Sequence, residues 1–191
     1  MNNIAKDLFD FSFSNSKTKI LAESENGISV EMVEFLGESE YQNIINISNV
    51  LVDSYGMQAK FNRTTVKKYF NYPKTLPFLI RFKGVPQGFV IGVPLENFER
   101  EHWVNCDEFL GFHNTIYTYA FIIKEEYRSF GLSKILKRIY HSTLKRRGYK
   151  FVTGHVREGI SQTFLNPPKI IAKFENWNNT GFRFEYYRTE L

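Results

Sequence analysis

The chain is poor in the residues that build covalent and metal-linked frameworks. Cys106 is the single cysteine among 191 residues, which excludes an internal disulfide. Neither a Gly-x-Ser-x-Gly nucleophile elbow nor a Walker lysine motif occurs. The histidines have no metal-ligand spacing with the cysteine, so no metal site is expected from His102, His113, His141 and His155.

Long apolar runs and compositional bias are absent as well. No stretch approaches the length of a membrane span, and residues 1–7 lack the basic region and apolar run of a secretory signal. There are no internal repeats and no low-complexity segments. We therefore expect a cytoplasmic protein without a membrane partner.

The chain does have enough apolar side chain for a core. Of its residues, 42% are hydrophobic and 17% aromatic, and a length of 191 residues predicts one domain. We place this domain at residues 17–191, after an N-terminal arm at residues 1–16. The net charge of +5 suits nucleic acid or a phosphate-bearing small ligand, and charge alone does not separate the two.

The most informative stretch predicts a strand, a glycine turn, a basic helix and a second strand. Residues 115–123 are rich in β-branched and aromatic side chains, which indicates a buried strand. Apolar residues then recur at helical spacing from Leu132 to Thr143, with lysine and arginine on the other face. Gly148 suits the left-handed position after this helix, and residues 149–156 are expected to form the next strand.

The turn between the first strand and the helix has the properties of an anion-binding site. Small residues at Ser129, Gly131 and Ser133 would let a ligand approach the backbone closely. The first amides of the helix have no internal partner and lie at the positive end of its dipole. Such a turn can bind a phosphate or pyrophosphate through its backbone alone.

This strand, turn and helix resemble the acyl-coenzyme A binding signature of the GNAT acyltransferase superfamily. In that signature Arg or Gln is followed by x-x-Gly-x-Gly or Ala, and here the matching residues are Arg128, Gly131 and Ser133. The resemblance covers this stretch well and the remainder of the chain loosely. It implies an α/β (α+β) fold of one domain, with a mixed, mostly antiparallel sheet splayed between two central parallel strands and helices on both faces.

The resemblance also implies a ligand and a reaction. Acetyl-CoA, or another acyl-CoA, would be the co-substrate, and its acyl group would pass to an amine that attacks directly, without a metal. The strand backbone would bind the pantetheine arm, and the turn would surround the pyrophosphate. The implied cofactor-binding residues are Phe121, Ile122, Ile123, Arg128, Ser129, Phe130, Gly131, Leu132, Ser133 and Lys134.

Catalytic groups are indicated less sharply. A base is needed to take a proton from the amine, and His155 and Glu158, at the end of the second strand, are the nearest candidates. Tyr119 is a third candidate, because it would face the acceptor from the first strand. A structural role is an alternative for His155, as a hydrogen-bonded histidine, and for Tyr119, as a core residue.

The proton donor for the leaving thiolate departs from the family pattern. Many members carry a tyrosine four residues before a Gly-Phe pair in the last helix. Here the pair is Gly181-Phe182 and that position is Trp177, whose indole cannot give up a proton at neutral pH. Tyr186 and Tyr187 are the substitutes that the sequence offers.

The other expected elements follow the order of the family. Asn26-Gly27 predicts a hairpin, and Asn62 is expected to cap a helix. We expect further strands at 17–23, 28–35, 76–82, 88–93 and 182–187, and further helices at 41–53, 64–70 and 169–177.

Residues 94–114 form a long acidic and aromatic loop. Loops of this length are often binding loops, and the alternative is an insertion that packs over a sheet edge. If the loop binds substrate, its acidity indicates an amine-bearing acceptor.

Two other classes of function stay open. The chain could be an acyl-CoA-binding sensor or interaction module without turnover, or a nucleic-acid-binding protein that uses residues 63–68 and the basic helix. We favour the transferase, with a small molecule or peptide as acceptor and nucleic acid as the less favoured partner. A homodimer, and an acyl carrier protein as donor, are left open.

Overall fold

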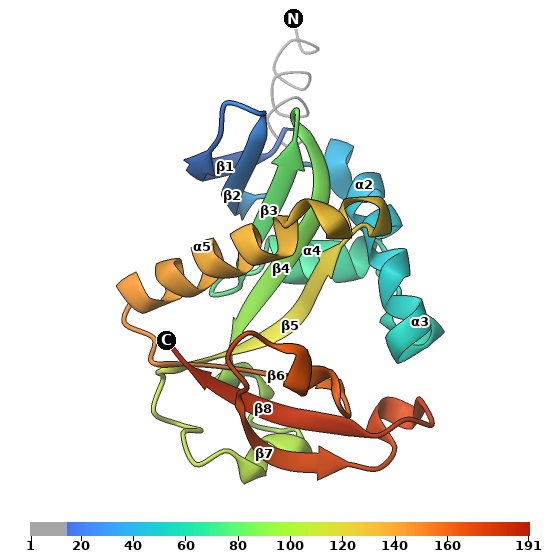
Figure 1. Ribbon diagram of the computed structural model, residues 1–191, viewed down its shortest axis with the longest axis vertical. Helices are drawn as coiled ribbons and strands as arrows, with labels where there is room; N and C mark the ends of the chain where they lie inside the picture. Colours follow the sequence, from blue (N-terminus) through green and yellow to red (C-terminus); the bar gives the residue numbers. More distant parts are fainter. Residues whose placement is uncertain (1–14) are drawn as a thin grey trace, which may run out of the picture.

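The computed structural model describes residues 15–191, which form one eight-stranded sheet in the order β1-β2-β3-β4-β5-β6-β8-β7 (Figure 1). Neighbouring strands are antiparallel except for β5 and β6, which are parallel. The strands are β1 (Lys17–Glu23), β2 (Ile28–Phe35), β3 (Leu76–Phe82), β4 (Val85–Pro94), β5 (Thr115–Ile123), β6 (Phe151–Arg157), β7 (Lys169–Phe174) and β8 (Phe184–Glu190). The arm expected at residues 1–16 lies outside the described residues except for its last two, and the domain boundary stays a prediction.

Helices cover both faces of the sheet. The α-helices of residues 15–191 are α2 (Glu38–Ser48), α3 (Val52–Tyr55), α4 (Arg63–Phe70) and α5 (Leu132–Arg146). The predicted cap of α4 is confirmed, because the Asn62 side chain accepts a hydrogen bond from the Thr65 amide at 2.9 Å. The expected hairpin is confirmed as well, with β1 and β2 antiparallel around Gly27.

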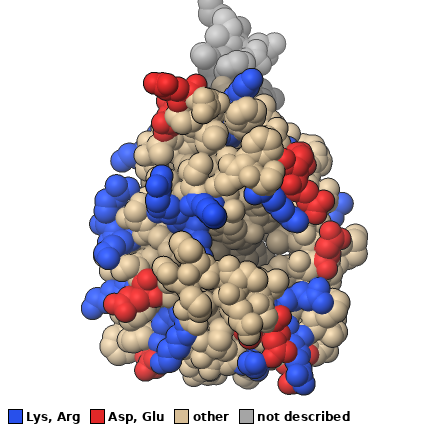
Figure 2. Space-filling view, viewed as in Figure 1, with Lys and Arg blue, Asp and Glu red and all other residues tan. Residues whose placement is uncertain are grey.

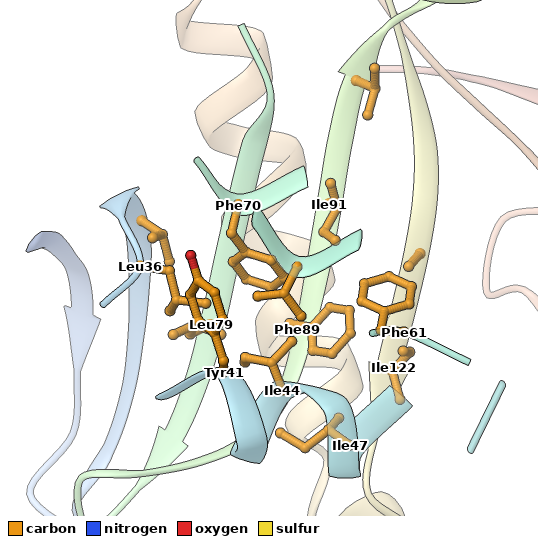
Figure 3. Close-up of a cluster of buried hydrophobic side chains, with 14 residues drawn as sticks. Leu36, Tyr41, Ile44, Ile47, Phe61, Phe70, Leu79, Phe89, Ile91 and Ile122 are labelled. Atoms are coloured by element: carbon orange, nitrogen blue, oxygen red, sulfur yellow. The ribbon is translucent and has the colours of Figure 1, made fainter. Parts of the chain in front are cut away.

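Two apolar cores sandwich the sheet. On one face, Phe89 and Ile122 of the sheet pack with Ile44 of α2 and Phe70 of α4 (Figure 3). On the other face, the apolar side of α5 is buried against β3, β4 and β5, with Tyr140 almost fully enclosed. The predicted fold class, with helices on both faces of a mixed and mostly antiparallel sheet, is thereby confirmed.

One predicted element is wrong. The helix expected at 169–177 is strand β7, which pairs antiparallel with β8. Its apolar run is too short for periodicity to separate strand from helix, and the β-branched pair Ile170-Ile171 favours the strand. Pro167 and Pro168 precede the strand, where they remove no hydrogen bond from the ladder.

The change from helix to strand also affects Trp177, the residue compared above with the family's tyrosine. Gly181 and Phe182 lie in the turn between β7 and β8, not after a helix. Trp177 lies in the same turn, so it does not stand at the family's tyrosine position.

Candidate active site

β5 and β6 are joined along only a short seam. Within residues 15–191 their pairing is limited to Thr115–Tyr117 with Phe151–Thr153. From Thr118 and Gly154 onward the strands diverge, so residues 118–123 of β5 pair with β4 alone. Figure 2 shows a hollow in the middle of the face that carries α5. The hollow lies at the height of the gap between β5 and β6 in Figure 1. The predicted splay is confirmed.

The turn after β5 opens in front of α5. A 3₁₀ turn at Glu125–Phe130 leads to Gly131, whose φ of +73° is left-handed, and a Cβ added to this glycine would meet no atom within 4 Å. α5 has no side-chain cap, and the first backbone bond into it runs from the Lys134 amide to the Gly131 carbonyl at 3.0 Å. The amides of Leu132 and Ser133 therefore have no acceptor within α5, at the positive end of the helix.

The residues predicted to bind the cofactor meet at this end of β5 and α5. Ile122, Ile123 and Leu132 are buried in the cores, so none of them offers its side chain to a ligand. Phe121 is 36% exposed and Phe130 is 67% exposed. The other predicted side chains are exposed or half-buried around the turn: Arg128, Ser129, Ser133 and Lys134.

Two basic side chains near the turn are available to an anion. The Arg128 guanidinium lies 3.3 Å from the Glu125 carboxylate, and exposed pairs of this kind contribute little stability. Lys137 is half-buried on α5 with its ammonium 4.1 Å from the Phe164 ring centroid, and burial lowers its pKa. Sequence reasoning did not include Lys137 in the site, although it lies one helical turn from Lys134.

Tyr119 lies on the face of the sheet opposite α5. It stands where the register between β4 and β5 shifts, and its ring stacks on Tyr69 of α4 at a centroid distance of 3.8 Å. Burial raises the pKa of Tyr119, so its hydroxyl is protonated at neutral pH. In this form Tyr119 can donate or accept a hydrogen bond, but it is not an anionic base.

His155 lies on the same face, inside a cage of aromatic rings. Its imidazole is 6% exposed, stacks on Trp177 at 3.6 Å and meets Trp103 edge-to-face at 4.9 Å. Nδ1 lies 3.0 Å from the Tyr117 hydroxyl, and Nε2 has no hydrogen-bond partner in the described part of the chain. Burial lowers the pKa of His155 to about 3, so the ring is neutral at pH 7.

This burial makes a prediction about acid stability. The folded protein holds His155 neutral, whereas the unfolded chain takes up its proton below about pH 6.5, so stability is complete above that pH and falls as the pH drops toward 3. Between pH 6.5 and 5 the loss is expected to be about 2 kcal/mol. Urea unfolding at several pH values measures the change in the free energy of unfolding with pH. This change should be smaller in His155→Gln than in the wild type. His102→Gln is the control, because His102 is exposed. If this variant reduced the pH dependence of the free energy of unfolding as much as His155→Gln does, the prediction would be wrong.

Glu158 lies apart from the other two catalytic candidates. Its carboxylate is exposed beyond the end of β6, 2.6 Å from the Lys173 ammonium and 3.9 Å from the Arg183 guanidinium. The hydrogen bond and charge of Lys173, followed by the charge of Arg183, lower the pKa of Glu158. The structure therefore brings His155 and Tyr119 to one face of the splay and leaves Glu158 paired elsewhere.

On the α5 face, Tyr187 places a hydroxyl at the splay. β8 sets Tyr187 opposite Gly154, and a Cβ on Gly154 would lie only 3.0 Å from the Tyr187 hydroxyl. Thr118, the first residue of β5 past the seam, interacts with Tyr187, and its hydroxyl lies 3.3 Å from the Tyr140 hydroxyl. Burial raises the pKa of Tyr187, so it keeps its proton at neutral pH.

Tyr55 contacts β6 from the face of the sheet opposite α5. Its hydroxyl donates to the His155 carbonyl at 3.1 Å, and its ring centroid lies 5.1 Å from that of Phe184. Nearby, the Gln58 amide donates to the Asn178 carbonyl at 3.3 Å. Sequence reasoning missed Tyr55, since a contact across 100 residues leaves no local pattern.

The acidic loop 94–114 is packed into the fold. Leu95 and Val104 are buried with Tyr117 and Tyr186. Three of its acids have structural partners: Glu96 accepts from the His113 amide, Asp107 binds Arg188 and Tyr186, and Glu108 binds Arg188.

Two acids of this loop remain available to a ligand. The carboxylates of Glu99 and Glu101 have no hydrogen bond or ion pair within residues 15–191. Glu101 lies close enough to Tyr69 that its charge, after the larger effect of burial, helps to raise the pKa of that tyrosine. In the chain it lies two residues before Trp103, whose ring contacts Tyr117 and His155.

The described residues hold neither a metal cluster nor a membrane span. No group of three or more His, Cys, Asp or Glu side chains in residues 15–191 could hold a metal ion. No helix in the same residues is both long and apolar enough to cross a membrane.

Comparison with known proteins gives similarity in structure but none in sequence. No protein-family model matches the chain, and no curated protein is found to be similar in sequence. A GCN5-related N-acetyltransferase from Kribbella flavida superposes with a TM-score of 0.64 at 10% identity, covering 88% of this chain and 100% of its own. The ribosomal-protein-S18-alanine N-acetyltransferase from Escherichia coli gives 0.60 at 11%, covering 85% and 93%. An IAA acetyltransferase from Bacillus cereus gives 0.54 at 13%, covering 86% and 99%.

Proposed function

Because the chain has the fold of the GNAT acyltransferases, we propose that it is an N-acyltransferase that transfers an acetyl or other acyl group from coenzyme A to an amine. One observation carries the proposal: the unpaired edge of β5 leads directly into an uncapped helix end with left-handed Gly131. A thioester ligand bound along that edge would place its reactive group in the splay. The amine would attack it directly, without a covalent enzyme intermediate.

The residues around the turn fit an acyl-CoA. The amides of Leu132 and Ser133, which have no acceptor within α5, are proposed to bind a pyrophosphate, which the empty space at Gly131 would let approach the backbone. Arg128 and Lys134 add positive charge at the same end. The backbone of β5 between residues 121 and 123 would pair with the amides of the pantetheine arm. When bound, the thioester supplies the activated acyl group.

The catalytic roles divide between the two faces of the splay. His155, with Tyr117 on its Nδ1, is proposed to receive the amine proton through the Tyr117 hydroxyl or a water. Tyr119 is proposed to orient the amine by a hydrogen bond. Glu158 would act as base only after release from Lys173. On the other face, the Tyr187 hydroxyl is proposed to donate a proton to the leaving sulfur.

The acceptor is proposed to enter on the face of Tyr119 and His155. Glu101 is one of the two unpaired acids of the loop and comes two residues before Trp103, which contacts His155 on this face. Its carboxylate suits the ammonium form of an amine before the proton is lost. The structural neighbour from Escherichia coli is named for an alanine of a ribosomal protein. We therefore propose an amine-bearing small molecule or a peptide as acceptor.

Calorimetric titration with acetyl-CoA tests the cofactor site. The wild type is expected to bind with a Kd of about micromolar, and Gly131→Arg at least tenfold more weakly, because its side chain fills the space in front of α5. Gly148→Arg is the matched control: it too has a positive φ with open space around it, at the other end of α5. Equal affinity in both folded variants would contradict the proposed turn.

A binding module without turnover is the second candidate. It is favoured by the state of the base candidates, since His155 is buried with a pKa of about 3 and Glu158 is already paired. Acetyl-CoA binding without consumption across a broad panel of amines would support this function over transfer.

A further inference from the structure

Arg157 is a cation that the fold holds in place without neutralising. It ends β6, and its guanidinium carbon lies 3.6 Å from the Phe182 ring centroid, a cation–π contact that holds the group against the ring. No carboxylate in residues 15–191 pairs with it. The N–H groups of the Arg157 guanidinium therefore remain available to bind an anion.

The acids around Arg157 are committed to other cations. Glu158, the next residue, binds Lys173 and Arg183. Glu175, in the turn between β7 and β8, binds Arg183. These carboxylates therefore pair with Lys173 and Arg183, while Arg157 packs on the Phe182 ring.

Arg157 lies on the acceptor side of the splay. It is two residues past His155, so both side chains project from the same face of β6. Phe184, opposite Arg157 on β8, contacts the Tyr55 ring, which comes from the same side. The cofactor turn, in contrast, leads into α5 on the other face of the sheet.

We propose that Arg157 binds an anionic group, a carboxylate, on the acceptor. The inference rests on the proposed transferase function and narrows its substrate class. Glu101 comes two residues before Trp103, which contacts His155 on this side, and its carboxylate suits the ammonium. The acceptor is then an amine that also carries a carboxylate, such as an amino acid or a short peptide. A guanidinium suits a carboxylate because two N–H groups can bind its two oxygens together.

Matched pairs of acceptors test this role. Each pair consists of an amino acid or dipeptide with a free carboxylate and the same molecule as its carboxamide, assayed for consumption of acetyl-CoA. The wild type is expected to prefer the carboxylate member through a lower KM. Arg157→Gln should raise that KM about tenfold or more and remove the preference. Arg157→Lys should restore part of it, and Arg138→Gln, on an exposed arginine of α5, should leave it unchanged.

The results that overturn the inference are distinct from a failure of the proposed function. Equal KM for both members of every pair in the wild type would overturn the role of Arg157. So would a Kd for acetyl-CoA that weakens in Arg157→Gln while the Kd for 3′-dephospho-acetyl-CoA does not, because the anion would then be a phosphate of the cofactor. If the wild type neither bound nor consumed acetyl-CoA, the transferase function itself would fall, and this inference with it.

Discussion

Asp107→Ala is expected to lower the free energy of unfolding by about 3–5 kcal/mol, the usual effect of removing one partner of a buried ion pair. The Asp107 carboxylate accepts from the Tyr186 hydroxyl at 2.6 Å and from the Arg188 guanidinium at 2.7 Å. It also accepts from the Phe109 amide at 3.0 Å. Its loss would leave Arg188, which is 6% exposed, with only the more exposed Glu108 as counter-ion.

Urea unfolding, with m-values compared, measures this loss. Glu99→Ala is the matched control, because it removes an acid of the same loop that has no ion pair within residues 15–191. The control should change stability by less than about 0.5 kcal/mol. If Asp107→Ala lowered the free energy of unfolding by less than about 1 kcal/mol, the loop would not be anchored through Asp107 and Arg188. Asp107 would then be available to bind a substrate.

Tyr187→Phe is expected to lower kcat about 100-fold while the Kd for acetyl-CoA stays unchanged. The substitution removes one oxygen atom at the splay, next to Gly154, and keeps the ring that packs edge-on against Phe164. If Tyr187 protonates the leaving sulfur, chemistry slows while binding does not. Burial raises its pKa, so the hydroxyl holds its proton throughout the neutral pH range.

Steady-state rates at saturating acetyl-CoA, beside calorimetric binding, separate the two effects. Tyr72→Phe is the control, since this tyrosine is exposed and its hydroxyl has no hydrogen-bond partner in the described residues. A Tyr187→Phe enzyme with the kcat of the wild type would remove Tyr187 from the mechanism. A loss of binding in parallel with rate would make it a residue of the cofactor site.

The parts of the fold that could be predicted are those with local causes. The Asn26-Gly27 hairpin, the Asn62 cap and the β5–α5 turn each depend on residues within a few positions of one another. Residues 169–177 are predicted as a helix, since a preceding proline pair suits a helix start and the six residues of β7 carry no decisive period. What makes β7 a strand is its pairing with β8.

The candidate site divides in the same way. Gly131 and the residues around it were found from a motif, because an anion cradle is built from consecutive backbone amides. The environment of His155 cannot be predicted from a motif, because Trp103 and Trp177 reach the imidazole from segments far apart in the chain. Its low pKa follows from that enclosure, and no spacing in the sequence reports it.

The short seam between β5 and β6 also bears on how the molecule holds together. Five strands lie on one side of it and three on the other, with three residue pairs between them. The ladder with the fewest paired residues thus lies in the interior of the sheet. Cooperativity between the two parts must therefore be carried by side chains, such as Tyr117 against His155 and Tyr55 on the His155 carbonyl. The residues that surround the chemistry would then also be those that make the protein unfold as one unit.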